Sequence, residues 1–251
     1  MRFATFTSQS RDGRLVVIST DGRRYLEVGD TAPNLLGAIE RWDALMPRLS
    51  ELADRLEQGE GDGFDPANCA APLPRSWQWL DGSAFSTHGE LMQVAFGLDP
   101  IEAEKPLMYQ GLSDRFYGPV DDVPFPGMEH GIDFEGEYGV IVDHVPMGTD
   151  AAEAMKHIKL IVQINDWSLR AIAPVEMKTG FGWVQAKPAC SMAPFAVTPD
   201  ELGDAWQDGR VCLDLEIDWN GKRFGAANGR EMDVGFHDLI AHAAFTRDLV
   251  A

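Results

Sequence analysis

The chain has 251 residues, of which 45% are hydrophobic and 24% charged, a composition typical of a folded globular protein and not of a disordered, collagenous or disulfide-rich one. Its 21 Lys and Arg stand against 40 Asp and Glu, and the resulting net charge of -19 argues against nucleic acid and anionic membranes as partners. The excess acids either form a solvated surface or include a cluster that binds a metal ion.

The cysteines and the N-terminal segment indicate in which cellular compartment the protein is expected. Cys69, Cys190 and Cys212 are far apart and form no Cys-x-x-Cys pair, so we expect buried free thiols. The first residues contain no apolar signal core, and no run approaches the roughly 18 apolar residues needed to span a bilayer. These features predict a cytoplasmic protein.

The first 70 residues predict a small β-rich domain that contains a helix. Two Asp-Gly steps, at Asp12 and Asp21, flank the apolar run 15–18 and are typical of tight turns between short strands. Residues 34–57 carry apolar side chains at helical spacing. The polar stretch 59–66, rich in Gly and Asp, is interpreted as the linker that follows.

The second predicted domain covers residues 71–251. A Pro- and aromatic-rich stretch leads into a loop-like passage to about residue 130, where functional sites tend to lie. Residues 135–142 are strand-like, 150–159 are helix-like with Asp150 as a candidate N-cap, and 160–164 are apolar and β-branched. The order is therefore strand, helix, strand.

The C-terminal part predicts a hairpin and a helix. Residues 211–219 alternate between apolar and acidic or small side chains, which is the period of a strand with one buried face. Asn220-Gly221 then predicts a tight turn into a partner strand. The segment 236–250 has a helical pattern and no Gly or Pro stop signal.

Glu135 and Glu137 form the first candidate site. They are two residues apart in a strand-like run, so both carboxylates project from one face, roughly 6–7 Å apart given the strand rise. On a solvated face their repulsion costs little. If the apolar flanking residues bury them, they require a cation, and carboxylate oxygens are hard ligands.

Asp166 directly follows the apolar run 160–164 and has two compatible interpretations. It can cap a following helix, or it can contribute a carboxylate to a site. If a helical turn begins here, Arg170 faces the same way and either pairs with Asp166 or clamps a substrate carboxylate.

Three further polar residues stand in otherwise apolar or aromatic surroundings. Asp81 and His88 are seven residues apart, and the histidine is either a satisfied structural residue or a functional group. Lys187 lies among small and apolar residues, where a lysine either extends its charged end to solvent or is functional.

Together, the motifs resemble the fumarylacetoacetate hydrolase family, specifically its longer bacterial members with a small N-terminal domain. The resemblance implies an α+β, mainly β protein whose catalytic domain is a mixed β-sandwich roll, assembled as a homodimer. Five motifs in family order carry it: Asp81 to His88, Pro106-Leu-Met-Tyr-Gln-Gly111, Gly131-Ile-Asp-Phe-Glu-Gly-Glu137, Asn165-Asp-Trp-Ser-Leu-Arg170 and Gly180-Phe-Gly-Trp-Val-Gln-Ala-Lys-Pro188.

The resemblance implies that Asp81, Glu135, Glu137 and Asp166 are the family's carboxylate ligands for a divalent cation, Mg²⁺, Mn²⁺ or Ca²⁺. The chemistry of the donors agrees independently. A set of oxygen ligands without Cys or His selects hard cations and argues against zinc or copper.

The resemblance also assigns roles in catalysis. His88 resembles the general base that activates a water molecule, and Lys187 the lysine that stabilises negative charge on the reacting substrate. Tyr109 and Arg170 resemble substrate-positioning residues, and Gln185 is a further candidate donor. Since the family uses activated water, no nucleophilic role is expected for Cys190.

Two departures from the family pattern are visible. The family's dyad pairs the histidine with a glutamate, and Glu90 is the nearest candidate to orient His88. Because residues i and i+2 point apart on a helix, Glu90 can do so only if the passage is extended or loop-like. The chain also ends at Ala251 without the loop and final strands that family members place next, so the catalytic domain is expected to lack them.

The implied function is divalent-metal-dependent hydrolysis of a carbon–carbon bond in a small 1,3-dicarbonyl acid, such as fumarylacetoacetate or an acylpyruvate, in the breakdown of tyrosine and other aromatic compounds. Decarboxylation of a 2-oxo diacid or hydration of a 2-oxo-alkenoate in the same site is the alternative, since metal-stabilised enolates serve all three reactions. A further alternative is a non-catalytic scaffold that retains only the metal site.

Overall fold

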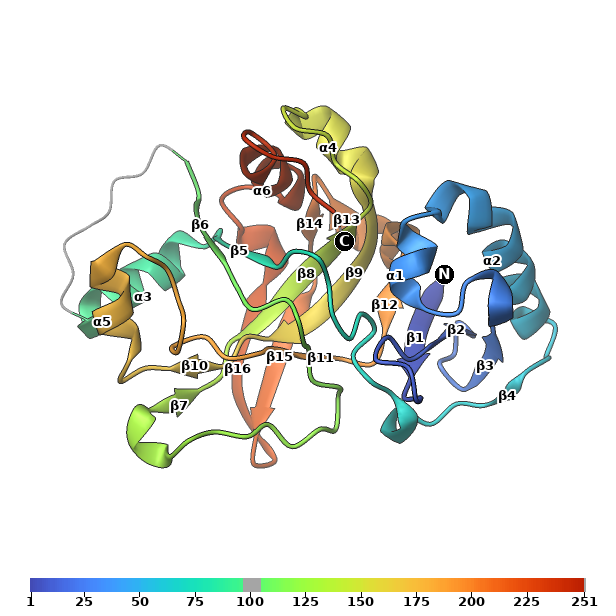
Figure 1. Ribbon diagram of the computed structural model, residues 1–251, viewed down its shortest axis with the longest axis horizontal. Coiled ribbons are helices and arrows are strands. Elements are labelled where there is room, and N and C mark those ends of the chain that lie inside the picture. Colours follow the sequence, from blue (N-terminus) through green and yellow to red (C-terminus); the bar gives the residue numbers. More distant parts are fainter. Residues whose placement is uncertain (97–104, 251) are drawn as a thin grey trace.

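A computed structural model describes residues 1–96 and 105–250, and it shows an α+β, mainly β architecture (Figure 1). The N-terminal strands are β1 (Arg2–Phe6), β2 (Arg14–Ile18) and β3 (Arg24–Glu27), which pair antiparallel in sequence order. Gly13 and Gly22 have φ of 66° and 71° in the connecting turns, the left-handed conformation that glycine adopts readily. The predicted strands and Asp-Gly turns are confirmed.

The helix predicted over 34–57 is two helices, α1 (Leu35–Ile39) and α2 (Trp42–Glu57). The chain leaves helical geometry at Arg41, where φ is -131° and ψ is 28°. After this break Trp42 packs edge-on against Phe3 of β1, with ring centroids 5.7 Å apart. The predicted apolar stripe is confirmed on α2, and its buried residues are Trp42, Leu45, Leu49, Leu52 and Leu56.

The predicted linker is wrong in part. Residues 62–63 form β4 (Asp62–Gly63), which pairs with β3 and extends the N-terminal sheet. On its other side the sheet continues into the second half of the chain, because β1 pairs with β12 (Ala196–Val197) and β12 with β9 (Ile158–Asn165). The strand order is β11-β9-β12-β1-β2-β3-β4, with β8 beside β9.

The loop predicted between residues 80 and 130 contains regular structure. A hairpin joins β5 (Leu80–Ser83) to β6 (Leu107–Gln110), and α3 (Ser86–Phe96) lies between them in sequence. Two of its apolar residues, Leu91 and Val94, are 69% and 83% exposed, so they do not mark a buried face.

The predicted strand–helix–strand unit is confirmed as β8 (Gly136–Val142), α4 (Ala151–His157) and β9. Asp150 caps α4, accepting a hydrogen bond from the Glu153 amide at 2.9 Å. Helix α4 packs on α6 (Phe236–Ala243), as Figure 1 shows. Helix α6 is shorter than the predicted helix 236–250.

The end of that predicted helix is extended instead. Leu249 forms an antiparallel bridge with Val145, with backbone hydrogen bonds of 2.9 Å in both directions. In a longer helix, the backbone groups of Leu249 would bond within the helix. Here they bond to Val145, which lies between β8 and α4, so the last residues of the chain are held beside that connection.

The predicted hairpin is confirmed as β15 (Asp214–Trp219) and β16 (Lys222–Asn228), but the strand predicted over 211–219 starts only at Asp214. Its predicted buried face is wrong in part, because Leu213 and Trp219 are 44% and 58% exposed. Asn220 and Gly221, with φ of 51° and 74°, form its turn. The remaining elements are β7 (Ile132–Asp133), β10 (Ser168–Leu169), α5 (Ala173–Thr179), β11 (Ser191–Met192), β13 (Trp206–Gln207), β14 (Arg210–Val211) and the 3₁₀ turns η1 (Gly29–Thr31), η2 (Pro66–Asn68), η3 (Met128–His130), η4 (Pro199–Ala205) and η5 (Gly229–Glu231).

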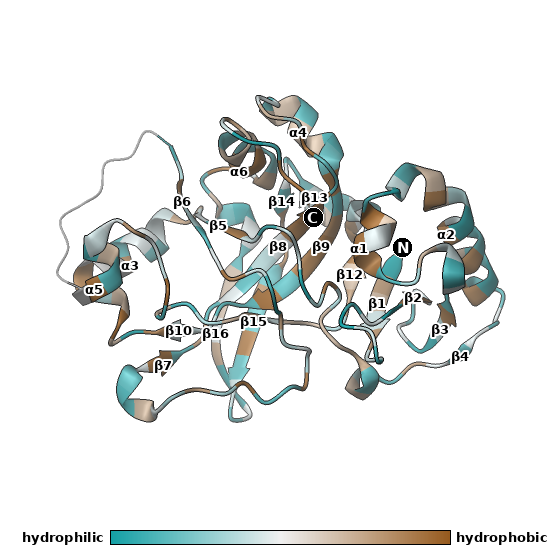
Figure 2. Cartoon of the chain, viewed as in Figure 1, coloured by the Kyte–Doolittle hydropathy of each residue, from teal (hydrophilic) through white to brown (hydrophobic). Residues whose placement is uncertain are grey.

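One core connects the two halves of the chain. Phe3, Leu49 and Leu160 belong to a single buried cluster, although they come from β1, α2 and β9. Figure 2 shows hydrophobic and hydrophilic residues alternating around α2, as expected of a helix that lies on this core. The three cysteines are free and buried, as predicted. Among the described residues, no helix has the length and apolarity to cross a bilayer.

This packing predicts a large effect of truncating Leu49, which is 0% exposed at the centre of α2. Leu49→Ala should lower the free energy of unfolding by about 2–5 kcal/mol, because it removes buried methyl groups and leaves a cavity. Asp54→Ala, on the exposed face of the same helix, should change it by less than about 0.5 kcal/mol. Urea denaturation of both variants checks this, and equal small losses would contradict the packing of α2.

Candidate active site

Three carboxylates from separate elements converge in the centre of the fold. Asp81 lies on β5, Glu137 on β8, and Asp166 directly after β9; one oxygen from each lies within 4.8 Å of the others. Strands β8 and β9 pair with Glu137 opposite Ile164, which brings Glu137 close to the residue that follows β9. Figure 1 shows β8 and β9 side by side. We call these three residues the carboxylate cluster.

The carboxylate cluster carries more negative charge than its surroundings favour. Burial raises the pKa of Asp81 to about 7, and the charge of Asp166 adds to the effect. Burial, followed by the charges of Asp81 and Asp166, holds the pKa of Glu137 well above its usual range. A divalent cation would relieve this repulsion, and three carboxylates are the hard oxygen donors that Mg²⁺, Mn²⁺ and Ca²⁺ prefer. The residues therefore fit such an ion.

Lys187 supplies one positive charge to the cluster. Its Nζ lies 2.6 Å from Asp166 Oδ2 and 2.9 Å from Glu135 Oε2, and the side chain is buried. Burial alone would lower the pKa of Lys187, but the two carboxylates outweigh it and raise the pKa above its usual value. The lysine is therefore charged, and its ammonium group is directed at two carboxylates and not at solvent.

Glu135 lies beside the carboxylate cluster and is held by cations. Arg170 Nη2 is 2.6 Å from its Oε1, Lys187 contacts its Oε2, and the Ser168 hydroxyl donates to Oε1 at 3.1 Å. Burial raises the pKa of Glu135, but Lys187 and Arg170 more than offset this and lower it. Glu135 is therefore ionised, although it does not belong to the group of three convergent carboxylates.

The expected pairing of Arg170 is wrong. No helical turn begins at Asp166, because residues 168–169 form β10, which pairs with β7. Arg170 consequently faces β7 and bonds Asp133 through Nε at 2.8 Å, as well as Glu135. Arg170 therefore pairs with two carboxylates of the protein, Asp133 and Glu135, and not with Asp166.

Tyr109 lies on β6, directly opposite Asp81 in the β5–β6 hairpin. Its hydroxyl donates to Asp166 Oδ2 at 2.6 Å, and the Trp183 ring packs edge-on against it. Burial and the charges of Asp81 and Asp166 raise the pKa of Tyr109 far above its usual value, so it remains a hydrogen-bond donor.

Cys190 is a site residue that the sequence did not reveal. Its thiol donates to Asp166 Oδ1 at 3.1 Å, and the side chain is buried. Burial and the charge of Asp166 raise the pKa of the thiol, so it stays protonated and is not a nucleophile. Nothing in the local sequence distinguishes Cys190 from a small core residue.

His88, Glu90 and Gln185 are less closely held. His88 and Glu90 are exposed on α3, and the described residues include no hydrogen bond or ion pair between them. The extended backbone that would let Glu90 orient His88 is not present. His88 lies close enough to Glu135 for its charge to lower the pKa of that carboxyl. The exposed Gln185 donates its backbone N–H to Glu176.

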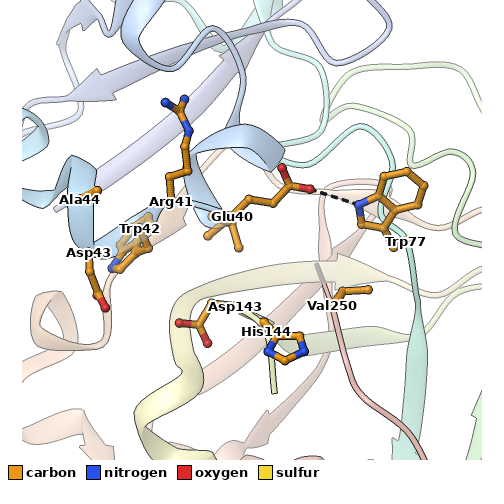
Figure 3. A pocket seen from close by; sticks show the side chains of 10 residues that line it. Glu40, Arg41, Trp42, Asp43, Ala44, Trp77, Asp143, His144 and Val250 are labelled. Atoms are coloured by element: carbon orange, nitrogen blue, oxygen red, sulfur yellow. Dashed lines mark hydrogen bonds between the residues drawn. The ribbon is translucent and has the colours of Figure 1, made fainter. Parts of the chain in front are cut away.

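A separate open pocket of about 590 Å³ lies between the N-terminal helices and the end of β8 (Figure 3). Trp42, Trp77, Asp143 and His144 line part of it, and Glu40 accepts a hydrogen bond from the Trp77 indole at 3.4 Å. No residue of the carboxylate cluster borders this pocket, so it is distinct from the candidate active site.

Two protein-family models together match nearly the whole chain. Residues 1–75 match the family described as "Fumarylacetoacetase N-terminal domain 2", and residues 78–251 match "Fumarylacetoacetate (FAA) hydrolase C-terminal". The second match alone includes all ten residues predicted for the site.

Two named proteins illustrate the similarity in sequence. The chain is 32% identical to 2,4-didehydro-3-deoxy-L-rhamnonate hydrolase of Sphingomonas sp. (strain SKA58) over 58% of its own length and 49% of that protein's. It is 25% identical to human mitochondrial oxaloacetate tautomerase FAHD2B over 92% of its own length and 76% of that protein's. The chain thus spans about half the length of the first relative.

Solved structures share the fold. Maleylpyruvate hydrolase from Sphingobium sp. SYK-6, in complex with manganese (II) ion and pyruvate, superposes with a TM-score of 0.71 at 17% identity, covering 98% of this chain and 83% of that one. Fumarylacetoacetate hydrolase from Exiguobacterium antarcticum gives a TM-score of 0.68 at 17% identity, covering 100% of this chain and 83% of that one. At this identity the likeness shows the fold alone.

The charge balance of the site predicts a marked effect of removing Lys187. Lys187→Met should lower the free energy of unfolding by about 3 kcal/mol, because Asp166 and Glu135 lose a buried cation at 2.6 and 2.9 Å. The control is Lys178→Met, which removes an exposed lysine of α5 that makes no ion pair among the described residues. Unfolding in urea measures both, and an unchanged stability in Lys187→Met would contradict the pairing.

Proposed function

The chain belongs to the fumarylacetoacetate hydrolase family, and we propose that it hydrolyses a carbon–carbon bond in a small 1,3-dicarbonyl acid with the help of a divalent cation. The observation that carries the proposal is the carboxylate cluster, in which oxygens of Asp81, Glu137 and Asp166 lie within 4.8 Å of one another. When bound there, the cation would polarise the two oxygens of a 2-oxo acid as a Lewis acid.

The identity of the cation and its ligands is part of the proposal. Mg²⁺, Mn²⁺ and Ca²⁺ all suit carboxylate oxygens, and the manganese and pyruvate in the maleylpyruvate hydrolase structure support a divalent ion beside a 2-oxo acid. We take magnesium as the resident ion. Family resemblance adds Glu135 as a fourth ligand, while in this structure its oxygens contact Lys187 and Arg170.

The surrounding residues have distinct proposed tasks. Lys187, fixed and charged in a buried position, stabilises negative charge that develops on a substrate oxygen. Tyr109 donates its single hydroxyl hydrogen to Asp166, and we propose that it positions the substrate through this carboxylate. We propose Arg170 and Gln185 as further substrate contacts, the former through its charge and the latter through its amide.

The hydrolytic step requires a base. His88 takes a proton from a water molecule as the water oxygen bonds to the carbonyl carbon of the acyl group. The carbon–carbon bond then breaks, its electron pair remains with the 2-oxo acid fragment as an enolate, and the proton on His88 passes to that fragment. Imidazole suits both transfers because it exchanges protons near neutral pH.

A second candidate is tautomerisation of a 2-oxo diacid such as oxaloacetate. It is favoured by the position of His88, which is exposed on α3 and has no acid bonded to it among the described residues. Moving a proton between carbon and oxygen needs a base but no activated water nucleophile. The match to an oxaloacetate tautomerase over 92% of this chain points the same way. Decarboxylation and hydration would use the same stabilised enolate.

The remaining expectations for the protein stay predictions: a homodimer, a cytoplasmic location and a part in the breakdown of tyrosine and other aromatic compounds.

Steady-state assays separate the two reactions. With Mn²⁺ or Mg²⁺, an acylpyruvate should be cleaved to pyruvate and a carboxylic acid, and EDTA should abolish turnover. Enol-to-keto conversion of oxaloacetate without cleavage of acylpyruvates would instead establish tautomerisation. Turnover that is indifferent to EDTA would contradict the metal-dependent proposal.

Calorimetric titration with Mn²⁺ tests the ligands. Glu137→Gln and Asp166→Asn should each weaken binding by more than about tenfold, because each removes a charged oxygen donor from a small set. Glu135→Gln tests the fourth proposed ligand by the same measure. Glu231→Gln, at an exposed acid outside the site, serves as the control. Unchanged affinity in both Glu137→Gln and Asp166→Asn would overturn the assignment.

His88→Ala tests the base. The variant should keep the Mn²⁺ affinity of the wild type, since His88 is not a proposed ligand, while kcat falls about 10²- to 10⁴-fold. Wild-type kcat in this variant would remove His88 from the mechanism, whichever of the two reactions the enzyme catalyses.

A further inference from the structure

One carboxylate, that of Glu176 on α5, accepts hydrogen bonds from three consecutive backbone amides. Val184 and Ala186 donate to Oε2 at 3.1 and 3.0 Å, and Gln185 donates to Oε1 at 2.9 Å. None of the roles proposed above involves Glu176. Three amides directed at one side chain form a specific arrangement, because each is a strong donor that would otherwise bond to solvent.

These amides belong to the segment 180–186, which joins α5 to Lys187. Gly180 and Gly182 have φ of 71° and 95°, so the backbone turns through a conformation that most residues avoid. The segment buries little apolar surface, since Phe181 and Val184 are 94% and 82% exposed. Apart from the buried Ala186 and the contact of Trp183 with Tyr109, hydrogen bonds therefore hold the segment in place.

The segment ends at the candidate active site. The Ala186 amide bonds to Glu176, the Ala186 carbonyl accepts from the Leu169 amide of β10 at 2.8 Å, and Lys187 follows immediately. Trp183, within the same segment, packs edge-on against Tyr109 with ring centroids 6.0 Å apart. The backbone that Glu176 holds thus carries both Lys187 and a ring that lies against Tyr109.

Glu176 is suited to this task by its charge. Burial raises the pKa of Glu176, but the three backbone N–H groups outweigh it and lower the pKa below the usual value. The side chain is therefore an anion at neutral pH, and hydrogen bonds to an anion are stronger than those between neutral groups.

We infer that Glu176 is a positioning residue, which acts through segment 180–186 to hold the Lys187 ammonium against Asp166 and Glu135. The inference deepens the proposed function and rests on it. Displacement of a charged group by about 1 Å can reduce turnover on the order of a hundredfold, so loss of the anchor should reduce turnover by way of Lys187.

Amide hydrogen exchange tests the anchor without reference to activity. In Glu176→Ala, exchange at Val184, Gln185 and Ala186 should become at least about tenfold faster, because their acceptor is gone. Glu176→Gln keeps one acceptor oxygen and should give an intermediate rate, which guards against a general folding defect in the alanine variant. Lys178→Ala, on the same helix, should leave these amides unchanged. Unchanged exchange at these amides in Glu176→Ala would overturn the inference.

A double-mutant cycle tests the route to Lys187. With the substrate that the wild type turns over, Glu176→Ala should lower kcat about ten- to a hundredfold, but should cause no further loss in a Lys187→Met background. Equal losses in both backgrounds would overturn the inference, since a general structural role would act regardless of Lys187.

Failure of the proposed function can be distinguished from failure of the inference about Glu176. If the wild type turned over neither acylpyruvates nor oxaloacetate, the proposed function would fall, while acetylation of Lys187 by acetic anhydride, followed by mass spectrometry, would still test the positioning. Faster acetylation of Lys187 in Glu176→Ala than in Lys178→Ala supports the inference, and equal rates overturn it.

Discussion

The repulsion among three buried carboxylates is the constraint on which the rest of the site depends. Asp81, Glu137 and Asp166 come from separate elements, and their oxygens lie within 4.8 Å of one another. An uncompensated group of this kind would cost several kcal/mol for each buried charge. Asp166 is accordingly surrounded by donors: Lys187 and Tyr109 share one of its oxygens, and the Cys190 thiol bonds to the other. The raised pKa values of Asp81 and Glu137 show that these donors compensate only part of the charge.

The sheet determines where those carboxylates meet. Strands β8 and β9 form a long antiparallel ladder, with a register shift between Ile141 and Val142, and this register places Glu137 close to Asp166. Strand β9 also pairs with β11 and β12. Because β12 pairs with β1, the N-terminal strands extend the same sheet and share its core. The N-terminal strands therefore belong to the same hydrogen-bonded sheet as β9, the strand that Asp166 directly follows. Tyr109 belongs to the separate β5–β6 hairpin, where strand pairing sets it opposite Asp81. Lys187 lies in a connection outside any strand, so its position depends on hydrogen bonds and ion pairs.

Features governed by local sequence could be predicted, and those governed by distant contacts could not. The turn at Asn220, the cap at Asp150 and the strand β8 follow from neighbouring residues alone. Helix α3 was missed, and two of its apolar residues, Leu91 and Val94, face solvent. The pairing of Arg170 was missed because its partner, Asp133 of β7, lies 37 residues earlier in the sequence. Motif resemblance brought together the residues of the site, but no local pattern marks Cys190 or Glu176, whose roles arise only from contacts made in the folded chain.

The balance of charge within the site explains why it favours a cation. Among the described residues, five carboxylates, those of Asp81, Asp133, Glu135, Glu137 and Asp166, stand against the two cations that form ion pairs in the site, Lys187 and Arg170. Since Asp133 and Glu135 are bonded to these cations, the excess negative charge lies on the carboxylate cluster. That charge can be met by protons or by a divalent ion, so the two compete for the same oxygens. Binding of the proposed cation would then displace protons from Asp81 and Glu137, so the occupancy of the site, and any reaction that depends on it, would rise with pH.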